Sequence, residues 1–526
     1  MTGPINAPLF AAFDSLLAAG RVAEAVEVAE AALVEGALSG KSAAQLRLKL
    51  SSALLMSGYA AKALSQAEEV LAGSRLDAEV YEAGRRACLI ALMAHDEFAA
   101  AREPAVAILA GTTSSSDDGS IAAALTTLGS VAWTEGRVAD SIMLLRGAVT
   151  RAQRGRFADR ALHPRQSLAV LLIALGELGK AEELLREDVR DIRAEDDRGW
   201  MVGVAAWRSR LHLAAGRIAE AVAHAESALA LADETGTRLF VPLARTTLAA
   251  AALHRGDLDP AEAVLERCQD EPPASRAQFL STYGAWIRAR ISDARDGPIV
   301  AMRSMAAVFD NLPANKRALL EEPALAAWLV RCALAAGDRT KARAVVDTAD
   351  QLSLSNTAFP SVAAIALHAR GVFEQDAAAL LQASSDHAHV WARASAAEDA
   401  GAVLVAEDQP QSGSATLESA IALYEQAGAV HDAERATRRW RELRVRTVQA
   451  AGRHRVSGWS GLTGPERRVS GLVALGLTNA QVGERLSLSR HDVDFQLRQI
   501  FRKLGVHTRV ELARLAMEHE ASWHDD

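Results

Sequence analysis

Four helix-start signals follow one another closely near the end of the chain, and they constrain its fold more than any other feature. Each is a Thr or Ser followed three residues later by Glu, Gln or Asp. The pairs are Thr463–Glu466, Thr478–Gln481, Ser489–Asp492 and Thr508–Glu511. The hydroxyl of such a pair can accept a hydrogen bond from an unpaired N–H in the first helical turn. The acid or amide can accept one from the backbone N–H of the Thr or Ser itself. These signals predict four short helices in this part of the chain.

Apolar residues within these segments recur at helical spacing. The stripes are Val469, Leu472 and Val473 in the first helix, Val482 and Leu486 in the second, and Val493, Leu497, Ile500 and Leu504 in the third. Gly476 and Gly505 stand where helices end in the left-handed conformation that glycine tolerates. Only Ser487 and Leu488 separate the second helix from the Ser489 cap. A turn this short predicts a helix-turn-helix whose second helix enters the major groove of DNA.

The segment resembles the LuxR-type helix-turn-helix found at the end of many bacterial regulators. The matching residues are Leu462–Thr463, Glu466, Val469, Gly476, Asn479, Leu486, Leu488–Ser489, Val493, Ile500, Lys503–Leu504–Gly505–Val506, Arg509 and Glu511–Leu512–Ala513. Asp492 stands where the family usually has Thr, Gln496 where it has His, Ala480–Gln481 where Lys–Glu is common, and Gly483 where Ala is common. Because Asp492 can still cap its helix, we interpret these departures as changes in affinity and not as loss of the domain.

The resemblance implies a transcriptional regulator that binds double-stranded DNA as a homodimer, with RNA polymerase as a further partner. In this family the last helix, here Arg509–Glu518, usually forms the dimer contact, which Val510, Leu515 and Met517 could supply. Large regulators of this type often carry an ATPase domain before a region of helical repeats. The chain resembles their repeat and DNA-binding portions without that ATPase.

The third predicted helix presents a polar face opposite its apolar stripe. A solvated charged face is ordinary on a surface helix, but it would leave Phe495 exposed for no reason. In a major groove Phe495 can meet a thymine methyl, Arg498 a guanine edge and Asp494 a cytosine amino group. We therefore predict base contacts from His491, Asp494, Phe495 and Arg498. Phosphate contacts, which position a protein without specifying sequence, are predicted for Asn479, Arg490, Arg502, Lys503 and Arg509.

Residues 1–433 repeat one theme, in which helical runs such as LLAAGRVAEAVEVAEAAL meet at a small turn. The predicted turn glycines are Gly20, Gly58, Gly136, Gly179, Gly216, Gly256 and Gly337, with Asp96 and Asp296 filling the gaps. Their spacing of roughly 40 residues is typical of an α-solenoid and is similar to degenerate tetratricopeptide repeats, so we expect ten to twelve helix pairs. The repeat weakens beyond residue 352. Gly111–Ser120 is expected to be a surface loop, and Glu271–Pro273 a break that bends the solenoid.

Charge is unevenly distributed along the chain. Residues 434–457 carry eight Arg against two Glu, whereas residues 1–433 have a net charge of −14 within an overall −8. At helical spacing Arg435, Arg438, Arg439 and Arg446 share one face, and Arg441 and Arg444 lie off it. Two interpretations stay open: this basic stripe pairs with acids of the solenoid, or it lies along the DNA backbone.

No pattern in the sequence indicates catalysis, a cofactor or a metal. Residues 36–42 (GALSGKS) have three residues between their glycines, whereas a phosphate-binding loop needs four and must follow a strand. The histidines around Asp386–His389 and those at 519 and 524 lack ligand spacing and are expected at the surface. Trp133, Trp207, Trp286, Trp328 and Trp391 are interpreted as core residues, with a ligand groove lined by some of them as the alternative.

The remaining features indicate a soluble cytoplasmic protein. The three cysteines (Cys88, Cys268 and Cys332) are far apart and are expected to be free thiols. Half of the residues are apolar but only 5% are aromatic, a composition that favours helix throughout, and no apolar run is long enough to span a membrane.

We therefore predict an all-α protein in three parts: a tetratricopeptide-like solenoid (1–433), a basic linker helix (434–457) and a four-helix LuxR-type DNA-binding domain (458–526). Its expected function is sequence-specific transcriptional regulation, with an unknown protein or small molecule sensed by the repeats. The alternative is an interaction scaffold whose helix-turn-helix is a docking module without DNA binding.

Overall fold

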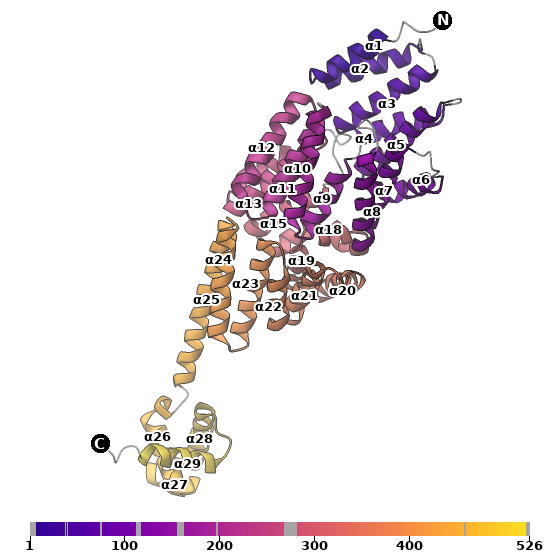
Figure 1. Cartoon of the computed structure of the whole chain (residues 1–526). Helices are drawn as coiled ribbons and strands as arrows, with labels where there is room; N and C mark the ends of the chain where they lie inside the picture. Colours follow the sequence, from indigo (N-terminus) through magenta and orange to yellow (C-terminus); the bar gives the residue numbers. More distant parts are fainter. Residues whose placement is uncertain are drawn as a thin grey trace. The chain divides into compact units, whose positions relative to one another are not determined.

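The computed structural model describes residues 7–36, 38, 40–73, 76–111, 117–154, 163–195, 198–267, 281–456 and 459–521. Within these residues the fold is all-α, as predicted, and contains no strand. The chain divides into two compact units, Met1–Thr437 and Arg438–Asp526 (Figure 1). None of the described helices is both long enough and apolar enough to cross a membrane.

Paired helices build the first unit, and each pair stacks on the next to form a tetratricopeptide-like solenoid (Figure 1). The eleven pairs among the described residues are α1 (Ala7–Ala18) with α2 (Val22–Val34), α3 (Gly40–Met56) with α4 (Ala60–Leu71), α5 (Ala78–Ala94) with α6 (Phe98–Ala110), α7 (Asp118–Thr134) with α8 (Val138–Arg154), α9 (Pro164–Ala174) with α10 (Leu178–Glu195), α11 (Arg198–Ala214) with α12 (Ile218–Thr235), α13 (Val241–Arg255) with α14 (Leu258–Arg267), α15 (Ser281–Asp296) with α16 (Pro298–Ser304), α19 (Leu325–Ala335) with α20 (Arg339–Ser355), α21 (Pro360–Glu374) with α22 (Ala377–Asp386), and α23 (Val390–Ala406) with α24 (Pro410–Gln426).

Short helices interrupt this series once. They are α17 (Ala306–Asp310), a 3-10 turn (Leu312–Ala314) and α18 (Lys316–Glu321), which lie between α16 and α19 and bring α18 against α7 and α9. A longer helix, α25 (Val430–Val456), follows the last pair.

Left-handed residues make the turns within the pairs. At Gly58 (φ 86°) the N–H donates to the carbonyl of Leu55, and the next N–H, of Tyr59, donates to that of Leu54, each over 2.8 Å. These two bonds satisfy the last carbonyls of α3 and start α4 immediately afterwards. The same left-handed conformation occurs at most of the predicted turn residues, namely Gly20, Gly136, Gly216, Gly256, Gly337 and Asp96.

Two of the predicted turn residues were wrong. Gly179 lies inside α10, and the turn before it is made by Gly176 at φ 79°. Asp296 is the last residue of α15, and Gly297 at φ 85° follows it in the left-handed conformation. In both cases a second candidate residue lay within three positions, and only the backbone shows which of the two carries the reversal.

The predicted weakening of the repeat beyond residue 352 was also wrong. Helix α20 continues to Ser355, and two further pairs follow before α25. Their turns are made by Gln375 (φ 58°) and Asp408 (φ 64°) instead of glycine. Residues other than glycine rarely adopt positive φ, so a prediction based on turn glycines did not recognise these two turns.

Small residues on the paired faces let the helices approach closely. Ala221, Ala225 and Ala228 of α12 are at most 1% exposed. Between α7 and α8, a Cβ added at Gly129 would lie 2.8 Å from Leu145, and the Ser141 hydroxyl donates to the Gly129 carbonyl over 2.7 Å. The abundance of alanine in the sequence therefore reflects the close spacing of the helices in each pair.

Successive turns of the superhelix touch one another. The imidazole Nε2 of His389 lies 2.7 Å from the carbonyl of Ile173, and the Arg317 guanidinium donates to Asp96 over 2.9 Å. These partners are 216 and 221 residues apart in the sequence. At roughly 40 residues per pair, one superhelical turn thus takes about five pairs. The first unit is consequently a superhelix whose successive turns are in contact, and not an extended array of pairs.

Several further expectations change once the structure is known. Of the expected loop Gly111–Ser120, residues 112–116 lie outside the described residues, but Asp118–Ser120 begin α7, and the Asp117 carboxylate accepts hydrogen bonds from the N–H groups of Gly119 and Ser120. Glu271–Pro273 lie outside the described residues. Cys88 and Cys332 are buried free thiols whose burial raises their pKa, and Cys268 lies outside.

The expectation that His387 and His389 lie at the surface was wrong. They are 3% and 7% exposed, and burial lowers the pKa of both. His389 belongs to the contact with Ile173, and His387 packs edge-on against the ring of His368. His519 stacks on Trp459 in the second unit, and His524 lies outside the described residues. No group of metal-ligating residues occurs in the described parts of the chain.

Asn356 joins two superhelical turns and is 4% exposed. Its amide donates to the carbonyls of Gly136 (2.7 Å) and Leu352 (2.8 Å) and accepts from the N–H of Val138 (2.9 Å). We predict that Asn356→Ala lowers the free energy of unfolding of the first unit by about 2–3 kcal/mol, because buried backbone groups lose their partner. Urea denaturation measures the change.

Asn315→Ala is the matched control, since the Asn315 amide makes one exposed bond, to Asn311. Its cost is expected below about 1 kcal/mol. Equal losses for the two variants would contradict the structural role of Asn356.

Candidate nucleic-acid interface

The second unit holds the predicted helices. They are α26 (Gly464–Ala474), α27 (Asn479–Leu486), α28 (Arg490–Leu504) and α29 (Arg509–Ala521), preceded by a 3-10 turn (Trp459–Gly461). The capping boxes at the starts of α26, α27 and α28 are present as predicted. The fourth differs: Thr508 accepts from the Glu511 N–H, but the Glu511 carboxylate accepts from the N–H of His507 and not from that of Thr508.

The predicted apolar stripes meet in one core. Val469 and Val473 of α26, Val482 of α27, Val493, Leu497 and Ile500 of α28, and Leu512 of α29 are all buried in it. Leu472, Leu486 and Leu504 pack at its margin. Gly476 and Gly505 adopt positive φ, as predicted. Each of the helices α26 to α29 thus presents one face to a shared core that lies wholly within this unit.

The turn between α27 and α28 is tight. Ser487 takes the left-handed conformation (φ 56°), and its N–H and that of Leu488 both donate to the carbonyl of Gly483. A Cβ at Gly483 would lie 2.6 Å from the carbonyl oxygen of Leu488. This chain therefore closes the turn more tightly than an alanine at position 483 would allow, which gives the departure from the family pattern a physical reason.

The face of α28 opposite the core is exposed. His491, Phe495, Arg498 and Arg502 all lie on it, and Phe495 retains 57% of its surface. Arg490, at the start of the helix, is exposed as well. This face, with an exposed aromatic ring among cations, is the candidate contact surface of the unit.

Three of the predicted contact residues bond to one another. The Asn479 amide donates to the Asp494 carboxylate, and the guanidinium of Arg509 donates to the Asn479 amide oxygen over 2.5 Å and to the carbonyl of Leu477. This network ties the starts of α27 and α29 to α28. The three residues therefore orient the exposed helix, a role that the sequence did not reveal because their positions are 15 and 30 residues apart.

Lys503 and Arg502 also bond within the domain. Lys503 reaches α26, where its Nζ lies 2.7 Å from Oε2 and 2.8 Å from Oε1 of Glu466, and Arg502 donates to the Gln499 amide. Burial alone would raise the pKa of Glu466, but hydrogen bonds from Lys503 and Thr463 outweigh it and lower that pKa. Glu466 thus caps α26 and holds the end of α28 at the same time.

Arg435, the first arginine of the basic stripe on α25, differs from the exposed arginines that follow it. Its guanidinium donates to Glu398 on α23 (2.5 Å) and to Asp432 (3.3 Å), so this arginine pairs with acids of the first unit. Arg438 and Arg441 are exposed, while the side chains of Arg444 and Arg446 lie outside the described residues. The interpretation that the stripe pairs with the solenoid is therefore correct for Arg435.

Comparison with known proteins is informative mainly for the second unit. The model of the family described as "Bacterial regulatory proteins, luxR family" matches residues 460–516. No curated protein matches the chain. Among solved structures, a Rap protein complexed with competence and sporulation factor is 13% identical, with 71% of this chain and 98% of that one covered at a TM-score of 0.42. Yeast Tom70 is 11% identical, with 82% and 96% covered at a TM-score of 0.24. At these TM-scores the likenesses add nothing beyond the helical-repeat fold already described.

The Glu466–Lys503 pair generates a prediction about pH. Because the pKa of Glu466 in the folded domain lies below its ordinary value of 4.5, the carboxylate stabilises the domain above that pH, and the contribution is lost as pH falls through the lowered value. We expect Glu466→Gln to lower the free energy of unfolding of the second unit by about 1–3 kcal/mol at neutral pH. The difference from the unmodified protein should vanish in acid, and denaturant unfolding across this pH range measures it.

Glu484→Gln removes an exposed carboxylate from α27 of the same unit and serves as the control. It is expected to have almost no effect at any pH. If the two variants unfolded alike at neutral pH, the capping and bridging role of Glu466 would be refuted.

Proposed function

We propose that this chain, whose residues 460–516 form a luxR-family domain behind a tetratricopeptide-like repeat region, is a sequence-specific DNA-binding transcriptional regulator. The observation that carries the proposal is the outward face of α28. It offers an aromatic ring and cations on a helix that is fixed by caps at its start and by a buried stripe along its length. In this proposal the protein acts in the cytoplasm and is not an enzyme.

In this proposal α28 enters the major groove. Phe495 meets a thymine methyl, Arg498 the O6 and N7 of a guanine, and His491 and Asp494 neighbouring base edges. Arg490 and Arg502 contact phosphates. Asn479, Arg509 and Lys503 approach the backbone while keeping the intradomain bonds that orient α28, because each retains further donors. The DNA is double-stranded, since only a duplex offers a groove of this width.

We further propose that two copies bind together and contact RNA polymerase. Val510 and Met517 of α29 are 78% and 54% exposed and provide an apolar face of the kind that a helix-to-helix dimer contact needs. Both proposals about partners rest on the family resemblance together with this exposed face.

The repeats, in our proposal, receive the signal and pass it to α25. The Asp432 carboxylate near the start of α25 is 4% exposed and accepts from Arg290 (3.2 Å), from the Trp391 indole (2.8 Å) and from Arg435 (3.3 Å). Burial would raise the pKa of Asp432, but the guanidinium of Arg290 and its other partners hold it well below the ordinary value. A charged anchor of this kind fixes α25 to α15 and α23, so a change in those helices reaches the chain that leads to the second unit.

Base reading by Arg498 is directly testable. We predict that Arg498→Ala weakens binding to a cognate site by about 1–3 kcal/mol and relaxes preference at one base pair, with little loss on random duplex. Arg490→Ala, at a proposed phosphate contact on the same helix, should weaken both by similar factors. Fluorescence anisotropy with the two duplexes measures each constant, and equal losses for Arg498→Ala on both would show that Arg498 contacts only phosphate.

The same titrations separate a regulator from an interaction scaffold. A DNA-binding protein loses affinity for random duplex linearly in log salt, because bound phosphates release counterions. A scaffold whose helix-turn-helix serves only for docking would show no affinity at low salt, and that result would refute the proposed function.

The sensing role of the repeats is tested by separating the units. The second unit has its own core, and Arg435 belongs with the first, so a fragment of residues 438–526 is the natural choice. We expect this fragment to bind the operator but to give a reporter output that no longer follows the inducing condition. A fragment whose output still tracked the signal as the full chain does would place the sensor outside the repeats.

A further inference from the structure

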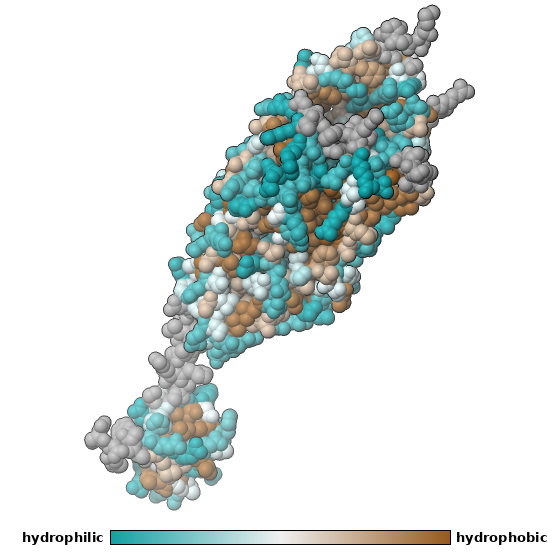
Figure 2. All heavy atoms as spheres, viewed as in Figure 1, coloured by the Kyte–Doolittle hydropathy of each residue, from teal (hydrophilic) through white to brown (hydrophobic). Residues whose placement is uncertain are grey.

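A cavity of about 200 Å³ lies on the inner side of the superhelix in the first unit. Its walls come mainly from the first helices of successive pairs, α5, α7, α9, α11, α13 and α15, and α18 with Glu322 forms its charged side. Figure 2 shows apolar residues gathered between strongly hydrophilic ones on one face of this unit. The interrupting helix α18 thus adds charged residues to a wall that the regular pairs line with mostly apolar ones.

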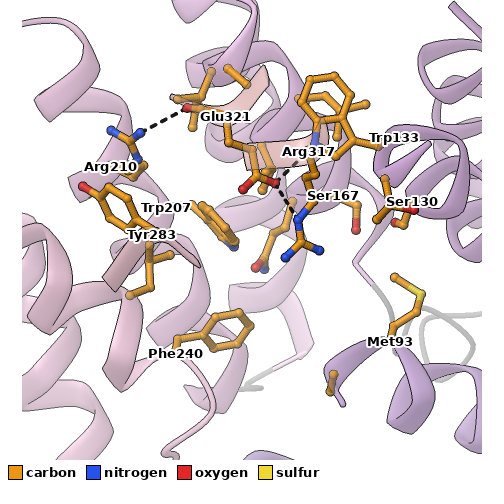
Figure 3. A pocket seen from close by; sticks show the side chains of 18 of the residues that line it. Met93, Ser130, Trp133, Ser167, Trp207, Arg210, Phe240, Tyr283, Arg317 and Glu321 are labelled. Carbon is orange, nitrogen blue, oxygen red and sulfur yellow. Dashed lines mark hydrogen bonds and ion pairs between the residues drawn. The ribbon is translucent and has the colours of Figure 1, made fainter. Parts of the chain in front are cut away.

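Aromatic side chains make up much of the wall. In Figure 3, Trp207, Phe240 and Tyr283 lie on one side of the space and Trp133 and Met93 on the other. Trp133 and Trp207 are two of the tryptophans that the sequence left open between core and ligand groove. They are 3% and 9% exposed and pack against the core while facing the cavity. Their burial confirms the core interpretation, and both also line the cavity.

The charged side of the cavity contains two arginines and two glutamates, and the arginines are already engaged. Arg210 donates to the Glu322 carboxylate and lies 4.4 Å from the centre of the Tyr283 ring. Arg317 pairs with Asp96 and with Glu321 and lies 5.3 Å from the Phe98 ring. Their side chains are only 12% and 13% exposed. Neither guanidinium is well placed to receive an anion without giving up an existing partner.

Glu321 is the charged group that stays open to the cavity. Its Oε1 receives the Trp133 indole N–H at 3.2 Å and lies 3.4 Å from Nε of Arg317, while Oε2 has no hydrogen-bond donor among the described residues. The side chain keeps 26% exposure, about twice that of either arginine. Burial raises the pKa of this carboxyl despite the nearby Arg317 and the Trp133 indole.

We infer that this cavity binds a small organic cation, a protonated amine that carries an apolar or aromatic body. The ammonium group donates to Oε2 of Glu321 and completes the compensation of that carboxylate. The body packs between Trp133, Trp207 and Phe240, whose faces attract cations and bury apolar surface. The inference deepens the proposed sensing role of the repeats and rests on it only for its biological meaning, since binding itself is independent of DNA.

Three probes of nearly equal shape test the charge class: phenethylamine, the neutral phenethyl alcohol and the anionic hydrocinnamate. Each is titrated into the full-length protein by isothermal calorimetry, with the fluorescence of the cavity tryptophans as a second readout. We expect phenethylamine to bind about tenfold or more tightly than the alcohol, because a charge-assisted bond replaces a neutral one. Hydrocinnamate should bind weakest.

Glu321→Gln tests the residue. The amide keeps the size of the side chain and an oxygen for the Trp133 indole, so the fold should persist, which thermal unfolding verifies. This variant should remove the advantage of the amine over the alcohol and leave the affinity for the alcohol nearly unchanged. Glu374→Gln, an exposed substitution on α21, is the matched control and should leave all three affinities as they were.

The inference fails if hydrocinnamate binds more tightly than phenethylamine, if amine and alcohol bind equally, or if millimolar phenethylamine does not bind. It also fails if Glu321→Gln keeps the preference for the amine. Because none of these titrations contains DNA, their failure leaves the proposed DNA binding untouched. A failure of DNA binding would likewise leave the cavity result standing.

Discussion

A single left-handed residue between paired helices is the constraint on which the first unit depends. It lets one helix end and the next begin within three residues, so that the paired faces meet with little chain between them. At Gly20, Gly136, Gly176 and Gly216 the same turns also touch the next superhelical turn, and an added Cβ would lie 2.0–2.9 Å from its nearest neighbour there. Glycine is needed at these positions for two reasons: it adopts the left-handed backbone conformation, and it leaves room for the close contact. At Gln375 and Asp408 the backbone takes the same conformation but the side chain is free to be larger.

Closing the superhelix on itself creates the conditions for buried charge. Arg210 and the three residues Arg317, Glu321 and Glu322 come from segments about a hundred residues apart and meet because α18 and the residue after it pack on the inner helices of the superhelix. Isolated charges in such a place would cost several kcal/mol each, so they occur as pairs with hydrogen bonds. The aromatic rings around them make the surroundings less polar, which strengthens the electrostatic interactions that a ligand would make. A cavity of this chemistry is therefore a product of the superhelix and of no single repeat.

The second unit uses polar residues to orient its exposed helix. Asn479, which accepts a hydrogen bond from Arg509, donates one to Asp494, and Glu466 pairs with Lys503, so both ends of α28 are tied to its neighbours. A helix that reads base edges must be positioned within a fraction of an ångström, and loose charged side chains could not achieve that. Charged residues at such a surface can thus serve orientation first and phosphate contact second.

Short-range features were determined by the sequence alone, because they depend on neighbours in the chain. The caps at Thr463, Thr478 and Ser489 and the buried stripe of α28 follow from spacing of three to seven residues, and the structure confirms them. The helical-repeat class follows from a small turn that recurs at roughly 40 residues, and it is confirmed as well. Contacts between residues far apart in the sequence were determined only by the tertiary structure. No local pattern shows that Arg435 bonds to Glu398, that His389 is buried against Ile173, or that Asn479 bonds to Asp494. Each of these contacts depends on how the helices pack, and a charged or polar side chain looks the same in the sequence whether it faces water, a buried partner or a cavity.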